Sequence, residues 1–250
     1  MPQAVFRFYA ELNDFLPRER RQASFSHAVT GRASVKDVIE SLGVPHTEVD
    51  LILVNGLSVD FGHIVADGDR VSVYPVFEAM DISPVIRLRP QPLRETAFVL
   101  DTHLGKLAAH LRLLGFDTLY HNDRADEALL RLSVDERRIL LTRDRGLLKR
   151  RELTHGYYVR ATDPDVQIRE VLGHFDLWAS ARPFTRCLAC NGQLEAVPRE
   201  AVADHVPPDV LAEQSEYRRC SGCGRVFWRG SHYDALSRFV EAVLAARPAR

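Results

Sequence analysis

The sequence predicts an α/β protein in which strands and helices alternate through the central part of the chain. Short β-prone runs alternate with stretches of helical spacing between residues 97 and 174, a pattern typical of a parallel sheet with helical crossovers. A separate α+β pattern precedes this part, and a segment with two Cys-x-x-Cys pairs follows it. We therefore expect more than one domain.

Length and composition fit a soluble protein with several domains. The chain has 250 residues, of which 46% are hydrophobic, and its formal net charge of −1 gives no overall attraction to nucleic acid. The N-terminus carries no signal pattern, and no apolar run reaches the ~18 residues of a membrane span. We expect a cytoplasmic protein without a membrane partner, and the sequence leaves the oligomeric state open.

Composition and the positions of the prolines and cysteines divide the chain into four regions. We expect a first α+β domain at residues 1–80 and a linker at residues 81–93. The linker contains Pro84, Pro90 and Pro92, which cannot lie within one continuous helix. The parallel-sheet domain follows at residues 94–182, and a cysteine-rich region with a last amphipathic helix at about 231–246 occupies residues 183–250.

The first region has β-prone runs at residues 4–9, 51–54 and 70–75, and a helix at 34–43 between Ser34 as N-cap and Gly43 as stop. This order resembles the ubiquitin-like β-grasp of small sulfur-carrier proteins. Those carriers act through a C-terminal Gly-Gly, whereas this chain reads VFEAM at 76–80 and continues. We therefore expect a module that docks onto a protein partner or aids solubility, and not sulfur transfer.

In the central region we expect strands at residues 97–100, 118–121, 139–142 and 157–160, and helices at 103–114, 125–134, 145–151 and 164–174. The helix at 103–114 places its leucines on one face, and Gly115 ends it. Lys106, His110 and Arg112 are expected elsewhere on its surface.

Acidic residues follow two of these strands. Asp101 comes directly after the strand at 97–100, and Asp144 follows the strand at 139–142. Asp126 and Glu127 open the second helix. Ligands of an open parallel sheet bind outside the carboxyl ends of its strands, and carboxylates there suit Mg²⁺ or Mn²⁺. Helix capping is the alternative role, because Asp is a favoured N-cap, and the two roles are compatible.

The strongest local signal is the pair of Cys-x-x-Cys motifs, Cys187 with Cys190 and Cys220 with Cys223. Four thiolates at this spacing fit a closed, structural zinc site. A redox role is the competing interpretation, but thioredoxin-like pairs follow a strand and open a helix. The 29 residues between Cys190 and Cys220 predict an insertion at about 196–215.

Four stretches together resemble the Mut-seven-C RNase domain family, a variant of the PIN-like nuclease fold with a C-terminal zinc ribbon. They read FVLDTHLGKLAAHLRLLGFD at 98–117, DEALL at 126–130, RILLTRDRGL at 138–147 and HGYYV at 155–159. The similarity runs from about residue 97 to residue 235, and an N-terminal ubiquitin-like extension accompanies some bacterial members.

The resemblance implies metal-dependent hydrolysis of RNA phosphodiester bonds. The acids of PIN-like nucleases, which hold Mg²⁺ or Mn²⁺, correspond here to Asp101, Asp144 and the pair Asp126 and Glu127; which of that pair binds the metal stays open. Asp163 is a candidate for a fourth ligand. Basic residues that could hold the RNA backbone follow the third strand. The alternative is that these residues only form the solvent-exposed face of a helix. They are Arg143, Arg145, Lys149 and Arg150.

Aromatic residues after the second cysteine pair leave two roles open. Phe227, Trp228 and Tyr233 are suited to stacking on RNA bases or to packing within the core. Our first hypothesis is thus a ribonuclease with catalytic Mg²⁺ or Mn²⁺ and structural zinc. The second is a non-catalytic RNA- or protein-binding adaptor, in which the acids only cap helices. The sequence identifies neither the RNA nor the partner of the first domain.

Overall fold

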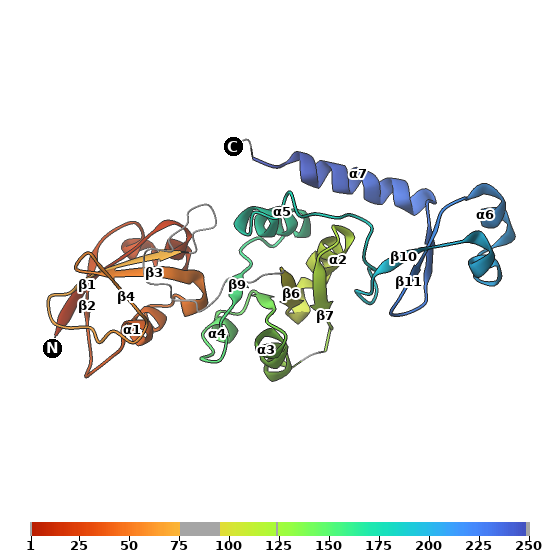
Figure 1. The fold of residues 1–250 in the computed structure, drawn as a ribbon. Helices are drawn as coiled ribbons and strands as arrows, with labels where there is room; N and C mark the ends of the chain where they lie inside the picture. Colours follow the sequence, from red (N-terminus) through yellow and green to blue (C-terminus); the bar gives the residue numbers. More distant parts are fainter. Residues whose placement is uncertain (1, 76–95, 124, 249–250) are drawn as a thin grey trace. The chain divides into compact units, whose positions relative to one another are not determined.

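The computed structural model describes residues 2–75, 96–123 and 125–248, with only the backbone described for Ser231. The expected linker at 81–93 and the stretch at 76–80 lie outside these residues. The chain forms two compact units, one of residues 1–95 with 126–158 and one of residues 96–125 with 159–250 (Figure 1).

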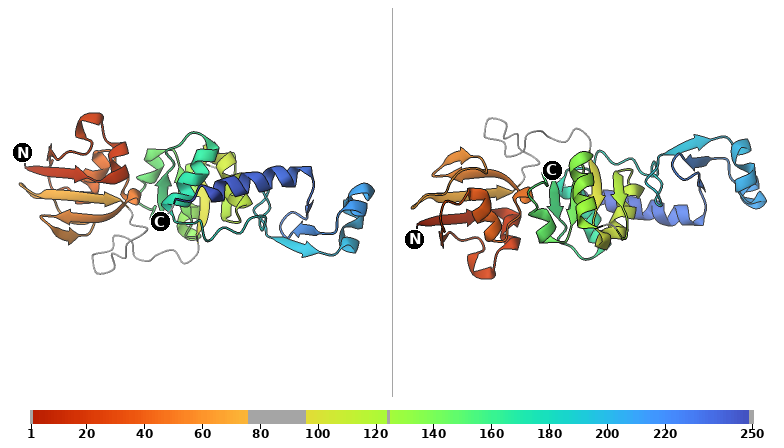
Figure 2. Two further views of the ribbon diagram at one scale, coloured as in Figure 1. Left: turned by 90° about the horizontal axis from the view of Figure 1, so that it is seen from above. Right: turned by 90° about the horizontal axis from the view of Figure 1, so that it is seen from below.

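The first unit contains a five-stranded sheet in the order β2-β1-β5-β3-β4, whose strands lie side by side in Figure 2. β1 and β5 run parallel, and the other neighbouring pairs are antiparallel. The strands are β1 (Gln3–Phe8), β2 (Phe25–Ala28), β3 (Val49–Val54), β4 (Leu57–Val59) and β5 (Arg70–Pro75), with helix α1 (Val35–Ser41) and 3-10 helices η1 (Ala10–Phe15), η2 (Arg18–Arg20) and η3 (His46–Glu48). This is the predicted β-grasp fold, with β2 and β4 as strands that the sequence did not indicate.

Helix α1 begins where the sequence predicts. Ser34 is its N-cap: the Ser34 hydroxyl accepts from the Asp37 amide at 3.2 Å, and the Asp37 carboxylate accepts from the Ser34 amide at 3.3 Å. This reciprocal capping box satisfies two helix-end amides. The helix then buries Val38 and Ile39 against a core that includes Phe6 of β1.

The same unit also holds α3 (Asp126–Asp135), β8 (Ile139–Thr142), α4 (Arg145–Leu148) and β9 (Gly156–Tyr158). β8 and β9 pair in parallel. Residues of the β-grasp contact this part directly: the buried Glu48 carboxylate accepts from the Tyr158 amide at 2.5 Å, and His46 Nε2 lies 2.9 Å from the Leu153 carbonyl oxygen. Helix α4 is shorter than predicted, because Lys149 already acts as its C-cap.

The second unit begins with β6 (Ala97–Leu100), η4 (Thr102–Leu104), α2 (Gly105–Leu113) and β7 (Asp117–Tyr120), and continues with α5 (Pro164–His174). β6 and β7 are parallel. Helix α2 ends at a glycine for a steric reason. Gly115 has φ +92°, and a Cβ there would lie 2.1 Å from the Arg182 carbonyl oxygen.

Helix α7 (Ser231–Ala245) packs against α5 and α2 within this unit (Figure 1). The His110 ring of α2 lies 4.4 Å from the Phe239 ring of α7, measured between ring centres. Before α7, strands β10 (Leu194–Val197), β11 (Tyr217–Cys220) and β12 (Val226–Trp228) form a three-stranded antiparallel sheet.

Between β10 and β11 the chain forms η5 (Arg199–His205) and α6 (Pro208–Glu213). Val202 and Val206 of this segment form a small buried cluster with Tyr217 of β11. The residues between the cysteine pairs therefore cover one face of the ribbon sheet. Together, the parallel strands, the β-grasp and the cysteine ribbon confirm the predicted fold class. Among the described residues, none of the helices combines the length and apolar character needed to cross a membrane.

Candidate functional site

The four cysteines come together as predicted. Their sulfur atoms all lie within 4.8 Å of one another, with Cys187 Sγ 3.8 Å from Cys223 Sγ and Cys190 Sγ 3.3 Å from Cys220 Sγ. Zinc–sulfur bonds of about 2.3 Å place tetrahedral sulfur atoms roughly 3.8 Å apart, which this cluster matches closely. The site can therefore hold zinc with four protein ligands and no open position.

The thiols differ in how readily they lose a proton. Burial raises the pKa of Cys187, and burial with thiol hydrogen bonds raises the pKa of Cys190 to about 12. Burial also acts to raise the pKa of Cys220, but hydrogen bonds from the amides of Cys223 and Gly222 and from the Cys190 thiol bring it to about 7. Clustered thiols that cannot all ionise alone suit a cation that neutralises them.

A buried arginine anchors the first cysteine loop to helix α2. Arg112 is only 6% exposed, and its guanidinium donates to the carbonyl of Thr118 at 2.9 Å. The same group donates to the carbonyls of Leu188 and Ala189, between the first two cysteines, at 2.9 and 3.2 Å. The prediction that Arg112 lies on the helix surface is wrong, because this loop covers it.

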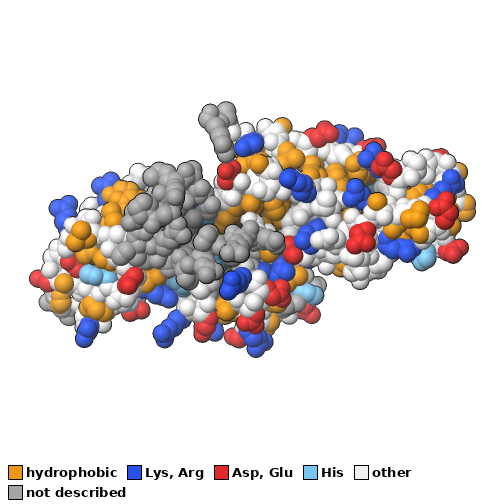
Figure 3. Space-filling model, viewed as in Figure 1, with side chains coloured by type: hydrophobic (Ala, Val, Ile, Leu, Met, Phe, Trp, Pro, Cys, Tyr) orange, Lys and Arg blue, Asp and Glu red, His pale blue; other side chains and the backbone are white. Residues whose placement is uncertain are grey.

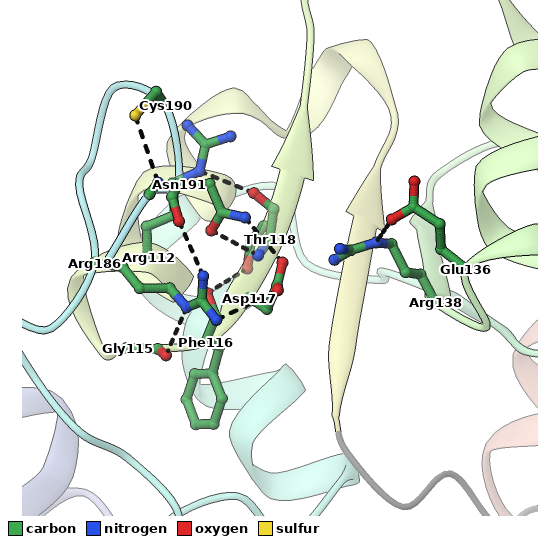
Figure 4. Close-up of polar contacts among 11 residues, drawn as sticks. Arg112, Gly115, Phe116, Asp117, Thr118, Glu136, Arg138, Arg186, Cys190 and Asn191 are labelled. Atoms are coloured by element: carbon green, nitrogen blue, oxygen red, sulfur yellow. Dashed lines mark hydrogen bonds and ion pairs between the residues drawn. The ribbon is translucent and has the colours of Figure 1, made fainter. Parts of the chain in front are cut away.

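A second link surrounds Asp117 at the start of β7. The Asn191 side chain accepts from the Thr118 amide at 2.9 Å and donates to Asp117 at 2.8 Å. Arg186 donates to Asp117 at 3.3 Å and to the Asn191 carbonyl at 2.9 Å (Figure 4). The first cysteine loop is thus joined to strand β7 by hydrogen bonds that sequence spacing alone does not reveal.

Asp101 follows β6 and is 7% exposed. Its Oδ1 accepts from the Thr102 amide at 2.5 Å and from the Thr102 hydroxyl at 3.1 Å, so Asp101 caps η4. The Tyr120 hydroxyl donates to the Thr102 carbonyl at 2.9 Å, which ties this turn to the end of β7. Both capping bonds end on the same carboxylate oxygen, Oδ1.

Asp144 follows β8 and is exposed. Its Oδ1 accepts from the amides of Gly146 and Leu147 at 2.6 and 3.4 Å, and Asp144 is therefore the N-cap of α4. Asp163 caps α5 in the same way through the amides of Asp165 and Val166. The capping role that the sequence left open is thus observed for Asp101 and Asp144, whereas Asp126 is itself the first residue of α3. Asp163 is an additional N-cap.

Asp126 and Glu127 are exposed in the first turn of α3. The Glu127 carboxylate lies 4.0 Å from the Arg150 guanidinium, an exposed pair that contributes little stability. Arg150 also lies 3.9 Å from Glu152. The first unit holds these acids together with Asp144, and Asp101 belongs to the second unit.

Two of the basic residues expected to hold RNA contact the β-grasp part of the first unit. Arg145 lies over the rings of Phe15 and Tyr158, at 5.0 and 5.2 Å from their centres. Lys149 donates to the Glu40 carbonyl at 2.7 Å. Nothing in the local sequence around α4 indicates the contacts with Phe15 and Glu40, because these two residues precede α4 by more than a hundred residues.

Two solved structures are similar to part of the chain. One is a crystal structure of the H. volcanii small archaeal modifier protein 1, with 20% sequence identity and a TM-score of 0.26, covering 31% of this chain and 100% of that one. The other, SAMP1 from Haloferax volcanii, has 19% identity and a TM-score of 0.25, and covers 31% of this chain and 99% of that one. No curated protein matches the chain.

Comparison with protein families gives two matches. Residues 1–81 match the Mut7-C ubiquitin family. Residues 96–240 match the Mut7-C RNAse domain, and this match covers more than half of the chain. Both agree with the β-grasp, the parallel strands and the cysteine cluster described above. The chain therefore belongs to the Mut7-C RNAse domain family.

Proposed function

We propose that this chain is a metal-dependent ribonuclease of PIN-like type, which hydrolyses phosphodiester bonds of RNA. The observation that carries the proposal is the Mut7-C RNAse domain match over residues 96–240, within which acids follow two strands. Asp101 follows β6 and Asp144 follows β8. Family likeness alone does not establish activity, so the assignment of residues needs its own support and test.

In this proposal Asp101, Asp144 and one member of the pair Asp126 and Glu127 hold Mg²⁺ or Mn²⁺. The donor set fits these hard cations, which prefer carboxylate oxygens. The capping bonds of Asp144 end on Oδ1, and such capping is compatible with metal binding by the same carboxylate. When bound, such a metal lowers the pKa of a coordinated water and stabilises the leaving oxygen of a phosphodiester.

Basic residues near the acids bind the RNA backbone in this proposal. Arg143 and Arg150 are candidates, and Arg150 lies 4.0 Å from the Glu127 carboxylate. Arg145 and Lys149 belong to the same set, but RNA has to compete for them with the contacts to Phe15 and Glu40. The zinc ribbon has a structural role, because four thiolates leave no open position on the ion.

The test is cleavage of a 5′-labelled structured RNA pool by the full-length, zinc-loaded chain with MnCl₂, with MgCl₂ or without added metal. We compare wild type with Asp144→Asn, because Asn caps helices about as well as Asp but carries no charge. Asp60→Asn is the matched control, since the exposed Asp60 carboxylate accepts from the Gly62 amide at 2.8 Å as Asp144 does from Gly146. We expect metal-dependent cleavage by wild type and the control, and loss of cleavage in Asp144→Asn.

The second candidate is a non-catalytic adaptor that binds RNA or, through the β-grasp, a protein. The observation favouring it is that Asp101 and Asp144 already have a structural task as caps. An adaptor binds RNA equally well as wild type and as Asp144→Asn, and cleaves with neither. That result contradicts the ribonuclease proposal if the protein used is folded and holds zinc at the four cysteines.

A further inference from the structure

We propose that a cavity beside the zinc ribbon binds one nucleotide of single-stranded RNA. The cavity has a volume of about 380 Å³ and lies within the second unit, between the ribbon strands, the segment at 183–194 and the start of α7. This inference rests on the proposed function, because RNA is the ligand in both. The site itself is separate from the carboxylates that follow the strands.

Four aromatic side chains line this cavity. Phe184 and Tyr233 lie with their ring centres 4.6 Å apart and their planes tilted by 34°. Phe227 and Trp228 come from β12, and all four rings are partly exposed. Aromatic faces that remain accessible provide stacking surfaces for unpaired bases.

The register of the ribbon sheet explains why one of these rings lies outside the core. Arg218 pairs with Phe227, and Tyr217 pairs with Trp228. Since side chains alternate between the faces of a sheet, Arg218 and Phe227 share the face opposite Tyr217. Tyr217 is buried against Val202 by the segment between the cysteine pairs, whereas the face with Phe227 contributes to the cavity.

Two arginines supply positive charge at the cavity. Arg218 and Arg229 are both exposed; Arg229 lies over the Tyr233 ring at 5.5 Å, and pairs with Glu216 at 3.1 Å. Arg218 makes a long 3.5 Å hydrogen bond to the Phe184 carbonyl. A third lining arginine, Arg186, directs its guanidinium to Gly115, Asn191 and Asp117 and so serves the fold.

This combination favours a nucleotide over a purely apolar ligand. The volume lies near the lower end of the ~300–1,000 Å³ typical of small-molecule sites, which suits a single nucleotide. Accessible rings can stack on a base while Arg218 and Arg229 contact the adjoining phosphates. Basic and acidic side chains are interspersed on the face drawn in Figure 3, and the formal net charge is −1, so binding of RNA by this chain would depend on a local site.

The test uses the full-length chain and a fluorescein-labelled uridine octamer, without added Mg²⁺ or Mn²⁺ to avoid cleavage. Fluorescence anisotropy gives the Kd of wild type, Phe227→Leu and Arg218→Ala. Phe227→Leu keeps an apolar side chain but removes the stacking face. Arg225→Ala is the matched control, because Arg225 is an exposed arginine of the same ribbon that does not line the cavity.

We expect Phe227→Leu to weaken binding by at least about fivefold, as loss of one stacked base implies. Arg218→Ala should weaken it and reduce the dependence of Kd on salt, whereas Arg225→Ala retains the wild-type Kd. Unchanged binding by both cavity variants, or no binding of the octamer by wild type, overturns the inference.

A second measurement does not depend on variants. An octamer containing 4-thiouridine is crosslinked to the wild-type chain by ultraviolet light, and the attached peptides are identified by mass spectrometry. We expect attachment within residues 183–194 or 217–236, and attachment elsewhere alone contradicts the site. If wild type cleaves RNA but the cavity variants bind the octamer as wild type does, the ribonuclease proposal stands and the cavity site is contradicted. If the cavity variants weaken RNA binding but wild type does not cleave RNA, the cavity site stands and the ribonuclease proposal fails.

Discussion

The guanidinium of Arg112 donates to the Leu188 carbonyl at 2.9 Å, which joins helix α2 to the loop that carries the first two zinc ligands. The bond crosses 76 residues of sequence. Further bonds from the same guanidinium reach Thr118 and Ala189, so the group is satisfied although it is buried. A buried charge that loses the hydrogen bonds that compensate it strongly destabilises the folded protein.

Arg112→Lys is therefore expected to lower the free energy of unfolding by about 2–4 kcal/mol, because an ammonium cannot reproduce the planar fork. Urea unfolding followed by circular dichroism measures this change, and a chromogenic chelator measures the rate of zinc release, which should rise. Arg238→Lys on the exposed face of α7 is the control. Equal stability of Arg112→Lys and wild type would show that the buried bonds contribute nothing.

Zinc removal should unfold the ribbon. Structural zinc supplies folding free energy, since the unfolded chain has no preformed site. Cys187→Ser, at a buried ligand, should reduce bound zinc from one ion per chain to nearly none, as measured by inductively coupled plasma mass spectrometry. Ser221→Ala, between the second pair of cysteines, should keep the metal. A zinc-free wild type with an unchanged unfolding profile contradicts a structural role for the ion.

Acid should weaken the contact between α2 and α7. Burial lowers the pKa of His110 below its ordinary value near 6.5, with Lys106 acting in the same direction and Asp163 and Asp165 opposing. Below that ordinary value the unfolded chain binds more protons at this position than the folded chain does. The free energy of unfolding therefore rises with pH through this window, and the contribution is lost as the pH falls.

His110→Gln removes this titration. The Tm of the variant should therefore fall less between pH 7.5 and pH 5.5 than the Tm of wild type does, whichever protein has the higher Tm at any one pH. His205→Gln, at an exposed position, is the control and should keep the wild-type slope. Differential scanning calorimetry at matched ionic strength gives both slopes. Identical slopes for wild type and His110→Gln contradict the argument.

Much of the fold could be predicted because its signals are local. The strands at 97–100 and 139–142 agree residue for residue with β6 and β8, and the predicted N-cap Ser34 is observed. The burial of Arg112 could not be predicted, because the loop that covers it lies far along the chain. The same applies to Lys149, whose partner Glu40 precedes it by 109 residues.

The contact between the β-grasp and β9 should depend on Glu48. Glu48 is 3% exposed and accepts from the Tyr158 amide at 2.5 Å. Glu48→Leu removes the Glu48 acceptor of this partly buried amide and should cost about 1 kcal/mol in unfolding free energy. Urea unfolding of Glu48→Leu and of the exposed control Glu19→Leu measures the difference. Equal midpoints for the two variants would contradict this role of Glu48.

Asp144 allows capping and metal binding to be separated. Asp144→Ala removes the acceptor for the Gly146 amide, now at 2.6 Å, and should cost about 1 kcal/mol, whereas Asp144→Asn keeps the cap. Binding of a ligand to the folded state alone raises Tm. We therefore expect MnCl₂ to raise the Tm of zinc-loaded wild type and of the control Asp60→Asn, but not that of Asp144→Asn. A full Mn²⁺ shift in Asp144→Asn would mean that Asp144 only caps α4, and the catalytic metal would then need other ligands.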